Sequence, residues 1–333
     1  MAGLCTLTGE ERLSLPGDHS NHNPSNGVRR NAGRLGVTCL AWALIAALLL
    51  IPAPIRAQDG ESTLPNAGSY DHSVATAWFD LMTELVRQAP GFTPPVASRA
   101  MGYAGVEFAG APNNSAAELK SMLDETGLVC CGWHTPLALV QGDKLDETIA
   151  FNETLGNNKL IIPGIPAELR QTHEDWRRMA DFFNELADKL EPYGMVTGYH
   201  NHHIEFTPID DGTPNGEAPW DTIFRNTQPS VIMQIDNGNA MMGGGKPIQI
   251  IMDYPGRAVT VHLKPYTQVA DPNDHEAAFR PIIGKDDVPW QDFFYACETV
   301  GGTEWYIVEY ESDAYPPLEA VKRCLDTLRA MGK

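Results

Sequence analysis

The sequence has few basic side chains for its length. Its 333 residues include 24 Lys and Arg against 43 Asp and Glu, which gives a formal net charge of −19. Five of the basic and three of the acidic residues lie in residues 1–57, so the remainder carries a balance of −21. Because such a surface repels the phosphate backbone of nucleic acids, the composition disfavours a nucleic-acid partner.

The sequence has one long uncharged apolar run, residues 35–51, and this run follows three arginines in residues 29–34. This order, closed by a small residue such as Ala57, is typical of an export signal. The apolar run has 17 residues, which is the short limit for a membrane-spanning helix, so an uncleaved anchor is the alternative. We expect residues 1–57 to be a signal peptide or anchor and residues 58–70 a linker. The mature protein would be exported, either periplasmic or secreted, and would touch a membrane only through an uncleaved segment.

Cysteine is also scarce, with six in the sequence and four after residue 57. The spacing of these four matches neither a disulfide framework nor a zinc knuckle. Cys130 and Cys131 are adjacent in a strand-like run, where cysteine is most often a small buried hydrophobe. A bridge between Cys297 and Cys324 remains an alternative, because an exported protein tolerates disulfides.

A glycine-rich dinucleotide fingerprint is absent after the first apolar runs, which disfavours an open doubly wound sheet. From residue 71 onward the chain alternates helical patterns with short apolar runs, the rhythm of repeated βα units. Seven runs predict strands, over residues 103–110, 128–134, 159–164, 195–202, 231–236, 258–264 and 305–310. Their spacing fits a (β/α)8 barrel, which averages about 30 residues per unit. We therefore predict a single TIM-barrel domain over residues 71–333, with its first strand at Ala75–Met82.

The last four predicted strands each carry a metal-binding type of side chain near the carboxyl end. The four residues are His200, Asp236, His262 and Glu309. Because the carboxyl ends of the strands in a parallel barrel form one rim, where the active site lies, these side chains are expected to converge. Any one of them alone is more often a cap or an ordinary hydrogen-bonding group. As a set, two imidazoles and two carboxylates predict one divalent ion, such as Mn²⁺, Co²⁺, Zn²⁺ or Mg²⁺.

The stretch "HNHHIEF" at residues 200–206 supplies further polar candidates. His202 shares the strand face of His200, and Glu205 follows closely, so both are candidate acid–base groups. Asn201 is a candidate substrate contact.

Three more polar residues fall at predicted strand ends and could reach the same rim. Glu107 and His134 are expected either to touch the substrate or to make structural hydrogen bonds. Lys264 shares the face of His262, so it could place a positive charge beside substrate oxygens, or extend to solvent at the barrel mouth.

Several segments resemble the xylose isomerase-like TIM-barrel superfamily, the group of sugar phosphate isomerases and epimerases. The matching segments include "MGYAGVEFAG", "GYHNHHIEFTP", "MQIDNGNAMMGGGKP", "YPGRAVTVHLK" and "GGTEWYIVEYE". The resemblance runs from about Val96 to the C-terminus. It implies one divalent metal held by residues of strands five to eight, which map onto His200, Asp236, His262 and Glu309.

The chain also departs from that family. The family often has Glu where this chain has His200, and its epimerases use two metal-bound glutamates to exchange a proton on opposite faces of a carbon. Only Glu309 remains from that pair. The candidates for a second acid or base are His202, Glu205, Glu107 and Lys264. Asn239 stands where the family's apurinic endonucleases have a histidine, and we expect it to contact the substrate.

The resemblance implies a metal-dependent isomerase or epimerase that removes a proton next to the carbonyl group of a sugar or keto-sugar. The alternative is a lyase, hydrolase or dehydratase acting on 3-keto-glycosides or inosose-like rings, and a non-catalytic sugar-binding barrel is a third reading. Export and the acidic surface both argue against phosphorylated substrates.

Overall fold

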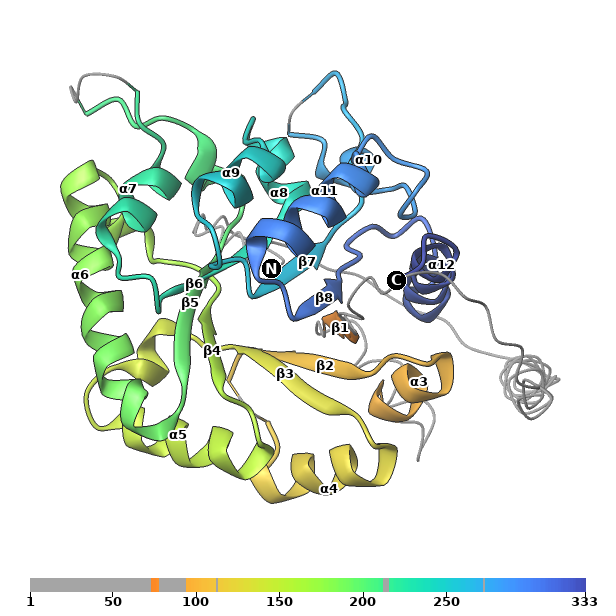
Figure 1. Ribbon diagram of the computed structural model, residues 1–333, viewed down its shortest axis with the longest axis horizontal. Coiled ribbons are helices and arrows are strands. Elements are labelled where there is room, and N and C mark those ends of the chain that lie inside the picture. Colours follow the sequence, from red (N-terminus) through yellow and green to blue (C-terminus); the bar gives the residue numbers. More distant parts are fainter. Residues whose placement is uncertain (1–72, 78–93, 112, 212–215, 272) are drawn as a thin grey trace, which may run out of the picture. The chain divides into compact units, whose positions relative to one another are not determined.

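The computed structural model describes residues 73–77, 94–111, 113–211, 216–271 and 273–333 (Figure 1). The expected signal or anchor segment, the linker and the later part of the expected first strand all lie outside these residues. Among the described residues, no helix is both long enough and apolar enough to cross a membrane.

The strands of the described chain are parallel and close into a barrel in sequence order, so the predicted TIM-barrel fold is confirmed. They are β1 (Ser73–Ala77), β2 (Gly105–Ala109), β3 (Val129–His134), β4 (Lys159–Ile162), β5 (Val196–His200), β6 (Ile232–Asp236), β7 (Thr260–Leu263) and β8 (Trp305–Val308). Strands β2 to β8 lie within the predicted ranges. Strand β1 begins two residues before the predicted start at Ala75, and the predicted part beyond Ala77 is outside the described residues.

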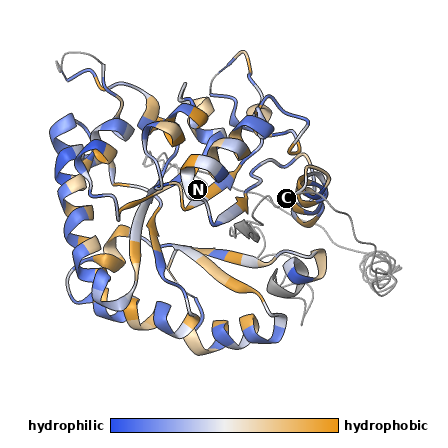
Figure 2. Cartoon of the chain, in the orientation of Figure 1, coloured by the Kyte–Doolittle hydropathy of each residue, from blue (hydrophilic) through white to orange (hydrophobic). Residues whose placement is uncertain are grey.

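Helices connect the strands and surround the barrel (Figure 1). The α-helices are α3 (Pro94–Met101), α4 (Ala116–Thr126), α5 (Lys144–Leu155), α6 (His173–Leu190), α7 (Pro219–Asn226), α8 (Asn237–Met242), α9 (Pro247–Asp253), α10 (His275–Ala278), α11 (Trp290–Ala296) and α12 (Pro317–Ala330). Short helical turns are η1 (Leu137–Val140), η2 (Ala167–Leu169), η3 (Glu191–Tyr193), η4 (Ile204–Phe206) and η5 (Cys297–Gly301). The outward faces of the helices around the barrel are mainly hydrophilic (Figure 2).

Helix α6 illustrates how local sequence produces these elements. Thr172 and Asp175 form a capping box at its start, which satisfies otherwise free backbone N–H groups. Apolar residues at helical spacing, including Trp176 and Phe183, bury one face. The chain then turns through η3 and reverses at Gly194, whose φ of 65° is accessible to glycine at little cost.

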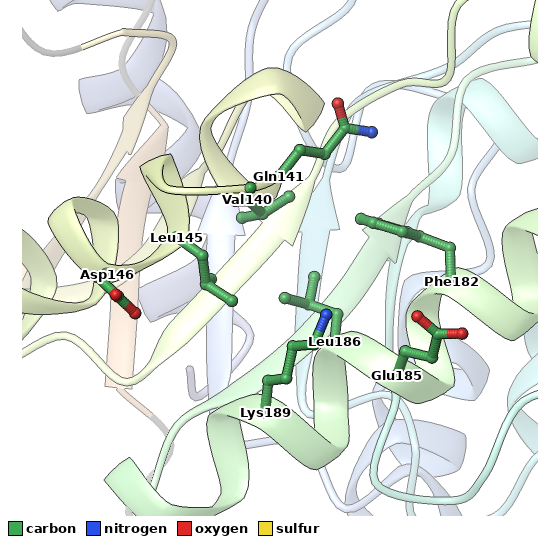
Figure 3. A pocket seen from close by; sticks show the side chains of 9 residues that line it. Val140, Gln141, Leu145, Asp146, Phe182, Glu185, Leu186 and Lys189 are labelled. Atoms are coloured by element: carbon green, nitrogen blue, oxygen red, sulfur yellow. The ribbon is translucent and has the colours of Figure 1, made fainter.

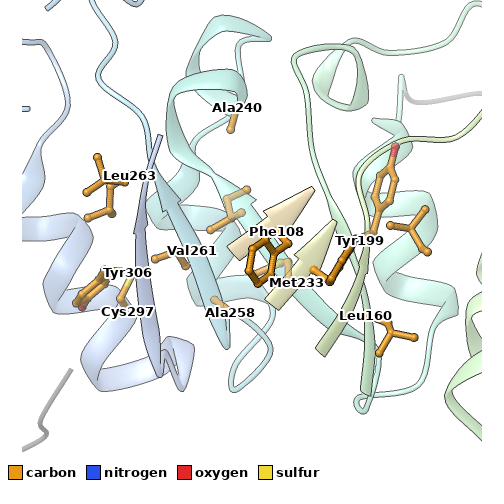
Figure 4. Packing of buried hydrophobic residues seen from close by; sticks show 14 of the residues in the cluster. Phe108, Leu160, Tyr199, Met233, Ala240, Ala258, Val261, Leu263, Cys297 and Tyr306 are labelled. Atoms are coloured by element: carbon orange, nitrogen blue, oxygen red, sulfur yellow. The ribbon is translucent and has the colours of Figure 1, made fainter. Parts of the chain in front are cut away.

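The two faces of each strand differ in chemistry, and this positions the site. Outward residues such as Tyr199, Met233, Val261 and Tyr306 pack in the hydrophobic core beneath the helices (Figure 4). The inward positions that alternate with them near the carboxyl ends carry polar and charged side chains. The barrel interior is therefore polar at the carboxyl ends of the strands.

The four described cysteines are buried free thiols. Cys130 and Cys131 are buried as predicted. Cys297 and Cys324, the alternative disulfide pair, are not bridged.

Candidate metal centre

Four strands bring four ligand-type side chains together. His200 ends β5, Asp236 ends β6, His262 lies in β7, and Glu309 directly follows β8. One ligand atom from each lies within 4.8 Å of the ligand atoms of the other three. All four residues are buried, with at most 3% of their surface exposed. We name these four residues the quartet. The structure brings together the four side chains that were predicted from the sequence to bind a metal.

Strand register explains the convergence. In the β6–β7 ladder Asp236 lies opposite His262, and in the β5–β6 ladder His200 lies opposite Gln234, two residues before Asp236. Because successive side chains alternate in direction, these residues share the inward face of the barrel.

The donor set of the quartet fits a divalent metal ion. Two imidazole nitrogens and two carboxylates form a mixed nitrogen and oxygen set of the kind bound by Zn²⁺, Mn²⁺ or Co²⁺. Buried carboxylates require a partner of opposite charge, because removing a charge from water costs several kcal/mol. A second group of possible ligands shares two of these residues and adds His134. The described residues therefore contain a buried cluster that could hold a metal.

Gln234 is the centre of the hydrogen-bond network behind the quartet. Its Nε2 donates to Glu107 Oε1 at 2.7 Å and to Thr260 Oγ1 at 2.9 Å. Its Oε1 accepts from His200 Nδ1 at 3.0 Å and from His134 Nε2 at 2.6 Å. With Nδ1 of His200 donating, Nε2 of that ring keeps its lone pair and remains available to a metal.

Glu107 orients His262 in the same way. His262 Nε2 donates to Glu107 Oε2 at 2.6 Å, which leaves Nδ1 on the side of the quartet. A Cβ atom at Gly132 would clash with Glu107 Oε1, so this glycine makes room for the carboxylate. Both oxygens of Glu107 are thus engaged inside the protein. Its catalytic role stays a prediction, while its contacts are those of a group that positions a ligand.

His134 contacts other side chains of the hydrogen-bond network. Its Nε2 is 3.2 Å from Glu107 Oε2 as well as bonded to Gln234. Its ring stacks on that of His262, with centroids 5.1 Å apart. Burial lowers the pKa of His134. Its substrate contact stays a prediction, and the contacts above fit the alternative of structural hydrogen bonding.

Electrostatics couple the quartet to Lys264. Burial opposes the ammonium charge, but Asp236, Glu309 and Glu311 raise the pKa of Lys264 well above its usual value. Burial raises the pKa of Asp236 to about 6 although Lys264 acts in the opposite direction. Burial would also raise the pKa of Glu309, but Lys264 and His262 hold it well below its ordinary value. Lys264 is therefore a charged member of the cluster and does not extend to solvent.

The two histidines of the quartet differ in charge. Burial would lower the pKa of His262, but Glu107 and Glu309 raise it to about 10, and Nδ1 of His262 hydrogen-bonds Glu309 Oε2. Burial lowers the pKa of His200 well below its usual value. A metal at this site would replace the proton on His262 and would meet an already neutral His200.

The stretch after β5 contributes to the rim of the site. The ring of His202 lies 5.4 Å from that of His200, and burial lowers the pKa of His202 to about 3. Glu205 accepts from Tyr199 Oη at 2.6 Å and from the backbone N–H of His202 at 2.8 Å. Glu205 therefore holds His202 in place, and burial raises the pKa of Glu205. Neither predicted acid–base role is tested by these contacts.

The two asparagines predicted to touch the substrate form hydrogen bonds with Asp236. Asn201 Oδ1 accepts from the backbone N–H of Asp236 at 2.8 Å, and its Nδ2 donates to the Asp236 carbonyl at 3.0 Å. Asn239 donates its backbone N–H and its Nδ2 to the two carboxylate oxygens, at 2.8 and 3.0 Å. The bonds from Asn239 fix the carboxylate of Asp236 at the start of α8, and those with Asn201 fix its backbone. Substrate contact by Asn201 and Asn239 stays a prediction.

The sequence interpretation missed two residues of this site. Gln234 lies two positions before Asp236 on the inward face, so strand alternation could have identified it. Glu311 pairs with Lys264 at 2.7 Å but lies beyond the end of β8, where no periodicity signals its direction.

The described cavities do not coincide with the quartet. One of about 330 Å³ lies between the start of α5 and α6, with Val140, Leu145 and Phe182 among its lining (Figure 3). Another, of about 170 Å³, is lined by residues around Trp133 and Phe151. Neither is lined by a member of the quartet, and the buried charges rather than these cavities identify the site.

A family model and several known proteins match this chain. A family described as xylose isomerase-like TIM barrel matches residues 96–331. The rhizopine catabolism protein MocC of Rhizobium meliloti is 22% identical over 243 residues, which cover 65% of this chain and 73% of MocC. An inosose dehydratase of Lacticaseibacillus casei is 24% identical over 153 residues, which cover 43% of this chain. The chain spans about half the length of that dehydratase, 49%.

Solved structures share the fold. A sugar phosphate isomerase/epimerase from Parabacteroides distasonis superposes with a TM-score of 0.63 at 22% identity, covering 77% of this chain and 98% of its own. The IOLI protein, solved with a bound zinc atom, superposes with a TM-score of 0.58 at 13% identity, covering 78% and 97%. At these identities the likeness supports the barrel fold alone.

Proposed function

Because the chain belongs to the xylose isomerase-like TIM-barrel family, we propose that it is a metal-dependent enzyme that removes a proton next to the carbonyl group of a sugar or keto-sugar. The single observation that carries the proposal is the buried quartet, whose ligand atoms lie within 4.8 Å of one another at the carboxyl ends of four strands. This is the end of such barrels at which active sites lie. The zinc atom in the IOLI protein and the sugar-type substrates named for several relatives support the assignment.

The residues divide into holding and reacting groups. His200, Asp236, His262 and Glu309 would hold the ion, which when bound polarises the substrate carbonyl and stabilises the charge that develops on its oxygen. Oε1 of Glu309 would accept the proton from the carbon next to the carbonyl. Nζ of Lys264, 2.8 Å from that oxygen, would carry the positive charge that stabilises or protonates substrate oxygens.

The geometry favours chemistry on one face of the substrate. Glu309 and Lys264 come from neighbouring strands, whereas the carboxylate of Glu107 is bonded to His262 and Gln234 on the inner side. Isomerisation needs one base, which takes a proton from one carbon and returns it to the next. We therefore propose isomerisation ahead of a two-base epimerisation.

A second outcome has its own support. A base and an ammonium group side by side can remove a proton and protonate a leaving hydroxyl, which is the elimination of water or of an alkoxy group. Inosose dehydratases of several bacteria are similar to this chain at 24% identity. A dehydratase or lyase acting on inosose-like rings or 3-keto-glycosides is the alternative outcome of the same first step.

The test joins metal analysis with NMR. Purified protein would be analysed for bound metal and incubated in D₂O with a panel of free sugars, 3-keto-sugars and inososes. Deuterium next to the carbonyl with the skeleton intact identifies an isomerase or epimerase, and loss of water or of an aglycone identifies elimination. Bound metal with every substrate unchanged and undeuterated would contradict the proposed activity and favour a sugar-binding barrel.

A further inference from the structure

Lys264 places an ammonium group inside the quartet. Its Nζ lies 3.3 Å from Asp236 Oδ2 and 2.8 Å from Glu309 Oε1, and its side chain is 1% exposed. A third carboxylate, Glu311, has its Oε2 2.7 Å from the same nitrogen. The ammonium group therefore contacts two carboxylates of the quartet and one carboxylate outside it.

The surrounding chain is built to hold Lys264 in this position. Asn237 accepts from the backbone N–H of Lys264 at 3.1 Å and donates to its carbonyl at 2.9 Å. A Cβ atom at Gly238 would lie 2.8 Å from Cγ of Lys264, so only glycine leaves room for this side chain. The ring of Phe279 lies 4.9 Å from Nζ, a distance at which an aromatic face attracts a cation.

We propose that Lys264 is an internal cation that competes with the metal ion for Asp236 and Glu309, and that Glu311 receives its ammonium group when a metal binds. The inference rests on the proposed metal site. A divalent ion and an ammonium group that share two carboxylates repel each other, so one must withdraw. Glu311 is the partner that remains, because it already contacts Nζ and does not belong to the quartet. Its side chain is 32% exposed, so it lies on the solvent side of the quartet.

This exchange gives Lys264 two positions with distinct roles. Without metal it compensates the charge of Asp236 and Glu309, which offsets the repulsion between these buried carboxylates. With metal bound, its ammonium group lies towards Glu311, where an incoming substrate oxygen can meet it. A purely structural salt bridge would instead support the quartet in both states.

Metal titration separates the two roles. Zn²⁺ or Mn²⁺ would be titrated by calorimetry into the full mature chain, into Lys264→Met and into Lys159→Met. Lys159 is a matched control, because it is a buried lysine paired with Glu304 at 3.0 Å but stands at the first residue of β4, away from the carboxyl ends of the strands. We expect Lys264→Met to bind metal at least about tenfold more tightly than the parent and Lys159→Met to be unchanged. Equal or weaker binding by Lys264→Met overturns the competition, whereas a parent protein that binds no divalent ion refutes the metal site itself.

Glu311 is tested by a double-mutant cycle. Glu311→Gln removes the alternative partner of Lys264, so metal affinity is expected to fall several-fold. In the Lys264→Met background the same substitution should have no effect, because no ammonium group remains to be received. An equal loss in both backgrounds shows that Glu311 acts by its charge alone and overturns its proposed role. Since Glu311 is partly exposed, this variant stays informative even if Lys264→Met unfolds, and unchanged affinity in Glu311→Gln alone is a second refuting result.

Discussion

Glu107→Gln tests whether Glu107 positions a metal ligand. The substitution keeps the size of the side chain but removes its charge, and it places an amide N–H₂ group against either His262 Nε2 or Gln234 Nε2, both of which donate. A hydrogen bond to a charged group contributes about 1.5–3 kcal/mol. Loss of the partner that orients a metal-binding histidine lowers metal affinity by about 10–100-fold, or about 1.4–2.7 kcal/mol. The two estimates agree, so we expect a loss in this range.

The assay is calorimetric titration of Zn²⁺ or Mn²⁺, with thermal unfolding of the metal-free protein as a measure of folding. Glu205→Gln is the matched control, because Glu205 is also a buried carboxylate near the site but bonds Tyr199 and the backbone of His202 rather than a side chain of the quartet. We expect the control to keep the parent's metal affinity. Glu107→Gln binding metal within a factor of about two of the parent would refute the positioning role, since that difference lies below the range expected for a lost orienting partner.

Three further predictions concern the metal ligands, the ion pair of His173 and Asp211, and the N-terminal segment. His262→Ala or Glu309→Ala should abolish metal retention and turnover together, and a variant that kept full turnover would show that the ligands are misassigned. His173→Gln should lower the free energy of unfolding by about 0.5–1.5 kcal/mol at pH 6, because the imidazole Nδ1 no longer donates to the Asp211 carboxylate at 2.9 Å, while the backbone N–H of residue 173 still does at 2.8 Å. Burial acts to lower the pKa of His173, but its contacts with Asp211 outweigh burial and raise that pKa. The stabilisation is therefore full below the pKa of about 6.5 in the unfolded chain, and it is lost as pH rises through the pKa in the folded protein. Denaturant unfolding of the parent and of His173→Gln from acidic to alkaline pH should show their free energies of unfolding converging at alkaline pH. Export predicts that cells producing the full chain yield a mature form starting near residue 58 outside the cytoplasm, and mass spectrometry of an intact cytoplasmic form would contradict it.

The strands that carry the site could be predicted from the sequence because they obey simple periodic rules. Apolar runs such as residues 231–236 are bounded by polar turns, and the barrel buries their outward faces under helices. Most predicted ranges are one or two residues too wide at an end, and the extra residues after the strands are mainly polar ones, such as Asn201, Lys264 and Glu309, that the ranges took in beyond the ladder. Strand β1 is harder to predict, because its residues run into a sequence of helical character without a turn signal.

Strand periodicity also makes the quartet predictable, but it does not predict the contacts of the residues around the quartet, such as Lys264 and Gln234. Alternation fixes which side chains of a strand share a face, so His200, Asp236 and His262 can be assigned to one rim from the sequence alone. The position of Lys264 cannot be predicted from the sequence, because its side chain lies close against Gly238, which belongs to another strand connection. The same holds for Gln234, whose uncharged amide matters only because three strands place Glu107, His134 and His200 around it.

The charge of the cluster gives a physical reason for an imidazole at position 200. The carboxylates in contact with the cationic groups of the site are Glu107, Asp236, Glu309 and Glu311. If a divalent ion replaced the proton on His262, this ion and Lys264 would leave a single negative charge in excess. A fifth carboxylate at position 200 would double that excess where burial penalises uncompensated charge most. His200 supplies a neutral nitrogen instead, since its Nδ1 donates to Gln234. The same imidazole leaves Asp236 and Glu309 as the carboxylates of the quartet, so its charge balance and the proposed one-face chemistry both depend on the residue at position 200.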